Sequence, residues 1–249
     1  MKPAYLWGAG FWAPGFADAA AWLDGQRDST VVQPSCTVLP SRQKRGTSLV
    51  TRLGAEVAAQ AVADAGLDSS DVHLVYGSAL GEIRTAVDQL DMMASDDGRL
   101  SPARFKNSVH NAPVGLLSVA WANRRSASAL AAGPATFAMC LLEALLLVHD
   151  QQRPVVVAVA DEPPDDSLAP GLEAYEPLAV GFCLGPEVRA GSRGAVSNFG
   201  RARAPLLPPS GNPAAAALPL LRAMLCREPG LVPVERDEQL PYCISLQFD

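Results

Sequence analysis

Apolar residues follow two patterns along the chain, and the two alternate from one end to the other. Short apolar runs bounded by glycine, proline or acidic residues predict buried strands at 4–7, 72–76, 155–160, 178–184, 195–199 and 242–248. Between them, apolar residues recur at helical spacing, as at Leu49, Leu53, Val57 and Ala61. Alternating strands and helices are typical of an α/β layered fold with a mainly parallel sheet.

Three helices are predicted with clear boundaries. The first is capped by Thr47 or Ser48 and ends at Gly66. The second covers 81–93, and its spacing predicts that Ile83, Val87 and Leu90 face inwards. The third covers 214–226, after a stretch at 201–213 that is rich in proline, alanine and glycine and therefore indicates a boundary.

The composition indicates a globular protein and argues against nucleic-acid-binding and membrane-spanning proteins. With 49% hydrophobic and 18% charged residues the chain is globular. Its net charge of −6 argues against nucleic-acid binding, which requires a basic face. The short basic cluster Arg42, Lys44 and Arg45 is a solvated loop or contacts an acidic partner. Apolar runs such as 144–148 are too short for a membrane span. A cytoplasmic protein is expected.

Neither a metal nor a cofactor is expected. The five cysteines are scattered and form no ligand-spaced cluster with histidine. Gly8, Gly10 and Ala13 match a dinucleotide fingerprint after a strand, but Pro14-Gly15 interrupts the helix that the fingerprint requires. The two glycines instead predict a turn with a close backbone approach.

The segment 108–148 contains the position where a nucleophile would be expected. It predicts a helix, a short strand, a tight turn, and a long apolar helix entered through Gly133-Pro134. Free backbone N–H groups at such a helix start can stabilise negative charge. The side chains available at this elbow are those of glycine, proline and alanine, and none of them can attack an acyl group.

The order of these motifs resembles the N-terminal half of a β-ketoacyl-acyl carrier protein synthase, a member of the thiolase fold. The matching stretches are the opening strand and turn at 5–15, the helix, turn and strand at 52–82, and the segment 108–133. In the last, Asn111 and Gly115 match the family's Asn-x-x-x-Gly pair. The resemblance implies a ketosynthase-like N-terminal domain at 1–200 and a reduced extension, a helix plus a strand, at 201–249.

The resemblance also implies a lost nucleophile. Active synthases carry a cysteine at the elbow, and counting from Ser126 and Ser128 places it at Gly133. Counting back from Glu143 places it at Pro134. The family's catalytic histidines come from its C-terminal half, whereas the 50 residues after Phe199 contain no histidine.

A synthase-like chain without a nucleophile resembles the chain length factors of type II polyketide systems. The patterns at 108–115 and 130–137 resemble most the short chain-length-factor-like subunit of aryl polyene clusters. This resemblance implies a non-catalytic subunit that pairs with an active ketosynthase, helps to form its acyl tunnel, and meets the acyl carrier protein only indirectly. The expected interface residues are Asn111, Ala120, Trp121, Ser128, Ala129 and Leu130. The expected tunnel residues are Phe105, Phe137 and Met139, each of which could equally be core.

Two other functions remain open. The chain could be an acyltransferase or hydrolase in its own right, using Cys140, Ser126 or Ser128 with His110. It could also be a homodimeric scaffold of the same fold. His73 and His149 have simpler explanations, as a strand residue near the surface and as a helix C-terminal residue with a favourable dipole position.

Overall fold

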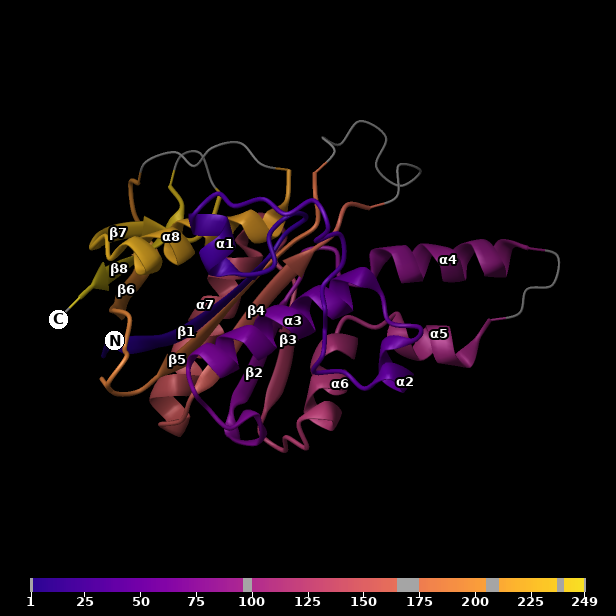
Figure 1. Cartoon of the computed structure of the whole chain (residues 1–249), viewed down its shortest axis with the longest axis horizontal. Helices are drawn as coiled ribbons and strands as arrows, with labels where there is room; N and C mark the ends of the chain where they lie inside the picture. Colours follow the sequence, from indigo (N-terminus) through magenta and orange to yellow (C-terminus); the bar gives the residue numbers. More distant parts are fainter. Residues whose placement is uncertain (1, 96–99, 165–174, 205–210, 237–239, 249) are drawn as a thin grey trace.

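The structure, a computed structural model, describes residues 2–95, 100–164, 175–204, 211–236 and 240–248. These residues form one eight-stranded sheet with helices on both faces (Figure 1). The strands are β1 Ala4–Trp12, β2 His73–Gly77, β3 Ala127–Leu130, β4 Val155–Asp161, β5 Leu178–Gly185, β6 Ala195–Arg201, β7 Gly230–Pro233 and β8 Tyr242–Gln247. The α-helices are α1 Ala19–Leu23, α2 Ser41–Lys44, α3 Leu49–Asp64, α4 Ile83–Ala94, α5 Pro102–Asn107, α6 Ala112–Ala120, α7 Thr136–Gln151 and α8 Leu218–Cys226.

The sheet is mixed, and its parallel part lies at one end. The strand order is β3-β2-β4-β5-β1-β6-β8-β7, so β3 and β7 are the edge strands of the described sheet. β2 pairs in parallel with both β3 and β4, whereas the other neighbouring pairs are antiparallel. The predicted layered α/β fold is therefore confirmed, and the expected parallel pairing is confined to the three strands β3, β2 and β4.

One face of the sheet is covered by α3 and α6. The helix α3 begins where the sequence indicates, because the Ser48 side chain accepts the Thr51 N–H. Glycines let α3 lie very close to the strands. A Cβ on Gly10 would come within 2.3 Å of the Val57 carbonyl oxygen, and one on Gly181 within 2.5 Å of the same atom. The glycines after the first predicted strand thus lie inside β1, and they serve helix packing instead of forming a turn.

The opposite face is covered by α7 and by the C-terminal helix α8. The buried side of α7 packs on β2 and β4, which makes it the centre of the larger apolar core. Among the described residues, the segment Gly133–Gln151 is long and apolar enough to cross a membrane by length and composition. The apolar stretch is therefore longer than the run at 144–148 that the sequence analysis considered, although one side of the helix is fully buried in the core.

Helices α4 and α5 form an arm that projects beyond the layered body, at the right of Figure 1. The helix α4 lies close to its predicted position, but the prediction that its apolar residues face inwards is wrong for Leu90. That side chain is 61% exposed, and Ile83 and Val87 are only half-buried. The physical reason is that α4 leaves the body of the protein, so no sheet lies beneath it.

The predicted extension at 201–249 adds to the same sheet. Its described part contains α8, preceded by a short 3-10 helix at Pro213–Ala217, and the strands β7 and β8. The strand β8 pairs with β6, and β7 covers the outer edge of β8. The helix and the last strand agree with the prediction, whereas β7 is not predicted. Part of the predicted boundary, at 205–210, lies outside the described residues.

Candidate functional site

The elbow between β3 and α7 keeps an ordered backbone without a reactive side chain. It consists of Ala131 and Ala132 followed by a 3-10 turn at Gly133–Ala135. Gly133 has a left-handed backbone with φ of 54°, which favours glycine. The buried Thr136 hydroxyl donates to the Gly133 carbonyl oxygen at 2.8 Å and accepts the Ala132 N–H at 3.0 Å. Thr136 therefore braces the turn.

Cys140, the alternative nucleophile, lies inside the core one turn along α7. Its exposed fraction is 0%, and its thiol faces Gly77 of β2. Burial raises the pKa of this thiol to about 12, and the negative charges of Asp161 and Glu143 add to the shift. Because the thiolate is the reactive form of cysteine, this thiol is poorly suited to attack an acyl group.

The structure does not bring His110 together with a serine. The Nε2 atom of His110 lies 2.9 Å from the carbonyl oxygen of Leu130, to which it donates. Ser126 contacts a different histidine, because its hydroxyl lies 2.5 Å from Nδ1 of His73 at the other end of β2. The Ser128 hydroxyl is buried and has no hydrogen-bond partner among the described residues.

The prediction that His73 is a strand residue near the surface is wrong, because its side chain is buried. It is 5% exposed, and burial lowers its pKa, together with the nearby guanidinium groups of Arg125 and Arg153. Its second ring nitrogen has no partner within the described parts of the chain. The Ser126–His73 pair thus lacks the orienting group that holds a catalytic histidine in place.

Buried carboxyl groups lie at the carboxyl end of the parallel strands, next to the elbow. Asp161 ends β4 and accepts hydrogen bonds at 2.8 Å from the Ser78 hydroxyl and the Ala79 N–H. Burial raises its pKa to about 6. Glu82, also buried, accepts from the hydroxyl groups of Ser48 at 2.7 Å and of Thr51. A carboxyl group directly after the apolar run at 155–160 is the signal that the sequence offers for Asp161.

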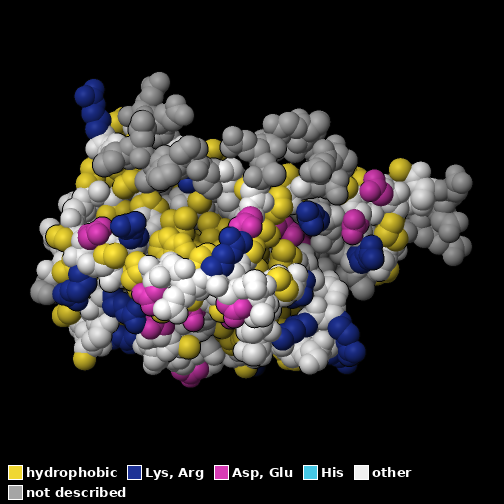
Figure 2. All heavy atoms as spheres, turned by 45° about the horizontal axis from the view of Figure 1, so that its top comes forward, with side chains coloured by type: hydrophobic (Ala, Val, Ile, Leu, Met, Phe, Trp, Pro, Cys, Tyr) yellow, Lys and Arg dark blue, Asp and Glu magenta, His cyan; other side chains and the backbone are white. Residues whose placement is uncertain are grey.

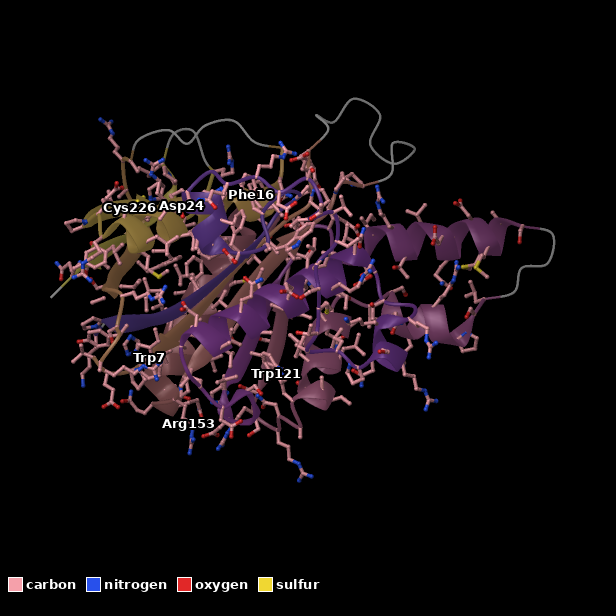
Figure 3. All side chains as sticks on the ribbon, viewed as in Figure 1. Trp7, Phe16, Asp24, Trp121, Arg153 and Cys226 are labelled. Atoms are coloured by element: carbon pink, nitrogen blue, oxygen red, sulfur yellow. The ribbon has the colours of Figure 1, made fainter. Side chains whose placement is uncertain are left out.

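The residues predicted to form an interface lie together along one edge. Ser128 and Leu130 are on the edge strand β3, Ala120 and Trp121 are at the end of α6, and Asn111 is exposed at the start of α6. Trp121 is half-buried, and Figure 3 shows it along the same lower edge of the molecule as Arg153. A candidate partner surface therefore follows β3 and α6.

The residues predicted to line a tunnel do not share one surface. Phe105 lies on the arm and is 58% exposed, whereas Phe137 is 1% exposed and its ring centroid lies 5.7 Å from that of Phe182. Met139 is half-buried on α7. In this chain by itself, Phe137 is a core residue and Phe105 is open to solvent. The described residues contain no cluster of histidine, cysteine and carboxylate side chains that could hold a metal ion.

Comparisons with known proteins agree with this architecture. A chain from the structure of the ketosynthase ApeO in complex with its chain length factor ApeC, from Xenorhabdus doucetiae, superposes with a TM-score of 0.76 at 23% identity, over 98% of this chain and 100% of that chain. The ishigamide ketosynthase/chain length factor gives a TM-score of 0.62 at 13% identity, over 81% and 67% of the two chains.

A type II polyketide synthase acyl-carrier protein in complex with its ketosynthase, AntDE:AntF, contains a chain that matches with a TM-score of 0.65 at 14% identity, over 82% and 70% of the two chains. These likenesses confirm the predicted thiolase-like fold. Comparison with curated protein sequences gives no match. The family model described as the β-ketoacyl synthase N-terminal domain matches residues 20–227, which is most of the chain. The chain therefore belongs to the β-ketoacyl synthase N-terminal domain family.

Proposed function

We propose that this chain is a non-catalytic, chain-length-factor-like subunit that pairs with an active β-ketoacyl synthase. The observation that carries the proposal is the elbow, where a strand meets a long helix at Gly133-Pro134 and no side chain can form an acyl intermediate. The only thiol nearby on α7, Cys140, is buried in the core with a raised pKa.

The geometry of the sheet supports a partner at β3. This strand is at the edge of the described sheet, so one side of its backbone is free to pair with another chain. The neighbouring helix α6 carries Val119, which is 69% exposed, and the half-buried Trp121. An open strand edge beside apolar side chains is a common form of protein interface. The chains named with the ApeO/ApeC and ishigamide structures are ketosynthases and chain length factors, which supports a ketosynthase as the partner.

The proposed pairing with a ketosynthase also assigns a role to each of the two chains. The partner supplies the nucleophile, and this chain closes one side of the acyl tunnel in fatty-acid or polyketide-type synthesis of an aryl polyene. Phe105, Phe137 and Met139 are the predicted tunnel residues. Phe137 could reach an acyl chain only after its packing on Phe182 opens, so Phe105 and Met139 are the stronger candidates. The acyl carrier protein delivers its cargo to the partner, and the complex works in the cytoplasm.

Two measurements test this function. The chain is co-expressed with the β-ketoacyl synthase of the same gene cluster, and the complex is analysed by size-exclusion chromatography. We expect a stable complex with one copy of each chain per pair. A chain that is homodimeric alone and fails to co-purify with the synthase would be a scaffold and would refute the proposal.

The second measurement is intact mass after incubation with an acyl-carrier-protein thioester. We expect an acyl adduct on the synthase and none on this chain. A stoichiometric adduct on Cys140, Ser126 or Ser128 would show that the chain is itself an acyltransferase. The Cys140→Ala variant then identifies the modified residue, because it removes the adduct only if the thiol carries it.

A further inference from the structure

A small cavity lies at the end of the sheet opposite to the elbow. It has a volume of about 80 Å³, and its lining comes from β1, the loop after β5, the C-terminal end of α8 and the last described residue of the chain. The strand β5 runs antiparallel to β4, so that Leu184 pairs with Val155 at one end and Leu178 pairs with Asp161 at the elbow end. The cavity is therefore separate from the candidate site at the elbow.

The loop after β5 has a fixed conformation beside this cavity. The Ser192 N–H donates to the Arg189 carbonyl oxygen at 3.0 Å, and the Arg189 N–H donates to the Ser192 hydroxyl oxygen at 2.9 Å. The Gly194 carbonyl oxygen accepts the Leu6 N–H of β1 at 2.9 Å. Gly194 has φ of 122°, and a Cβ there would come within 3.0 Å of Leu246 in β8. The loop is thus held against both β1 and β8.

Two arginine side chains line the cavity, and each of them lies over an aromatic ring. The guanidinium carbon of Arg189 is 4.0 Å from the centre of the Trp7 ring, and that of Arg227 is 5.0 Å from the centre of the Phe248 ring. Arg189 also donates to the Ala65 carbonyl oxygen. A guanidinium group has five N–H donors in one plane, so stacking on a ring leaves donors at its edge for a bidentate contact. Both groups are therefore positioned before a ligand binds.

The lining of the cavity favours an oxyanion. The Ser192 hydroxyl accepts one hydrogen bond and can donate its own proton to a ligand. None of the described residues that line the cavity is acidic. Liquid water occupies about 30 Å³ a molecule, so the cavity holds about two or three waters or one tetrahedral anion. Arginine matches the geometry of phosphate, which it binds through two parallel hydrogen bonds.

The charge of the whole chain limits the ligand to a single phosphate group. Figure 2 shows Lys and Arg side chains at the left of the view, the side where Figure 1 places both ends of the chain. The net charge of the chain is nevertheless −6, which opposes the binding of a polyanion such as nucleic acid.

We propose that this cavity binds one phosphate group between the guanidinium groups of Arg189 and Arg227, with the Ser192 hydroxyl as a further donor. The ligand is inorganic phosphate or the terminal phosphate of a small phosphate monoester, whose remaining atoms lie outside the cavity. The site goes beyond the proposed function, because it is far from the elbow and is complete without a partner subunit. A bound phosphate connects the loop after β5 to the end of α8, so it joins the C-terminal extension to the rest of the fold.

Calorimetric titration of the free chain with inorganic phosphate tests the site. The variants Arg189→Gln and Arg227→Gln each remove one positive charge from the cavity. Arg222→Gln is the matched control, since it removes the same charge from an exposed position on α8 outside the cavity. We expect one phosphate per wild-type chain, and a dissociation constant at least about tenfold higher in each site variant but unchanged in the control. Arg189→Lys keeps the charge without the planar fork, and its dissociation constant should be intermediate.

Thermal unfolding gives a second readout that separates binding from folding. Phosphate should raise the unfolding temperature of the wild type and of Arg222→Gln, because a ligand that binds only the folded state stabilises it. It should leave the unfolding temperatures of Arg189→Gln and Arg227→Gln unchanged. Unaltered circular dichroism spectra without phosphate show that the variants fold.

Glycerol 3-phosphate distinguishes the two sources of the phosphate group. Competition with inorganic phosphate would identify a phosphate monoester as the ligand, and binding of inorganic phosphate alone would identify the free anion. The proposal is overturned if neither probe binds saturably, or if Arg222→Gln weakens binding as much as the site variants do. Because the free chain is titrated, these outcomes are independent of whether the chain pairs with a synthase.

Discussion

The sulfur atom of Cys140 lies directly against Gly77, where a Cβ would come within 2.5 Å of it. The same Cβ would lie 2.9 Å from the Thr136 methyl group and 3.0 Å from a methyl group of Val159. Helix α7 and strand β2 are therefore as close as a glycine allows, at the point where the elbow begins. The cysteine of α7 is part of this packing, and it is not directed toward a substrate.

Replacement of Gly77 by alanine should destabilise the protein. The added methyl group has no room among Cys140, Thr136 and Val159, and overpacking of this kind costs about 1–3 kcal/mol. Urea unfolding measures the change. Gly115→Ala is the matched control, because Gly115 lies in α6 with nothing within 4 Å of its Cβ direction. This control should stabilise the protein by about 0.5–1 kcal/mol. Equal effects of the two variants would contradict the tight contact.

The cysteines should differ sharply in reactivity. Cys226 is exposed, whereas Cys36, Cys140, Cys183 and Cys243 are buried. We expect Ellman's reagent to titrate one thiol per native chain at about pH 8, and the Cys226→Ser variant to titrate none. All the cysteines should react after unfolding in guanidinium. Rapid modification of Cys140 in the native protein would show that the core around α7 opens.

The stability of the fold should depend on the protonation of Asp161. Its pKa is raised from 3.8 to about 6 by burial, so the folded state favours the protonated carboxyl. The resulting stabilisation is complete below about pH 4 and is lost as the pH rises through about 6. Asp161→Asn remains neutral and can still accept from Ser78. Relative to wild type it should gain up to about 3 kcal/mol above pH 7 and nothing near pH 4.

Unfolding curves at a series of pH values test this expectation. The informative quantity is the difference between wild type and variant, since the other carboxyl groups titrate in both proteins. A difference that does not change between acid and neutral pH would show that Asp161 titrates normally.

The buried Gln89 and the exposed Leu90 of α4 predict opposite responses at neighbouring positions. Gln89→Leu replaces a buried amide that has no partner among the described residues, and it should stabilise the free chain by about 1–3 kcal/mol. Leu90→Gln changes an exposed side chain and should stay within about 0.5 kcal/mol of wild type. Thermal unfolding of the free chain measures both. Destabilisation by Gln89→Leu would indicate that ordered water satisfies the amide.

Trp121 should matter more to the complex than to the fold. A Trp121→Glu change puts a charge beside the β3 edge, where a partner would have to desolvate it, so co-purification with the synthase should fall strongly. The free chain should lose less, because Trp121 is only half-buried. Comparable losses of stability and of binding would identify Trp121 as a core residue. Val32→Glu is a useful control, since Val32 is 66% exposed in the loop between α1 and α2.

The sequence predicts correctly those features that depend on a few neighbouring residues. The Ser48 cap of α3, the strand at 155–160 and the elbow at Gly133-Pro134 could all be predicted, because caps, continuous apolar runs and Gly-Pro turns act over a few residues. The family resemblance added the order of these elements, which periodicity alone does not provide.

The sequence-based predictions are wrong for features that depend on contacts between distant parts of the chain. Helical spacing identifies an apolar side of α4, but it cannot show that the helix leaves the body and exposes Leu90. The pairing of Ser126 with His73 depends on the register of β2 and β3, whereas the alternative open from the sequence combines Ser126, Ser128 or Cys140 with His110. The antiparallel pairings of β5 with β4 and β1 likewise arise from topology.

The left-handed backbone of Gly133 has a consequence for the evolution of this elbow. A cysteine at this position would hold a Cβ at φ of 54°, a conformation that costs an L-residue about 1–2 kcal/mol. At Pro134, which is exposed, replacement by cysteine would lose only the fixed φ that proline supplies at the first helical position. Regained acyl chemistry would therefore arise more readily at Pro134 than at Gly133. It would still need a base, because Nε2 of the nearby His110 already donates to Leu130.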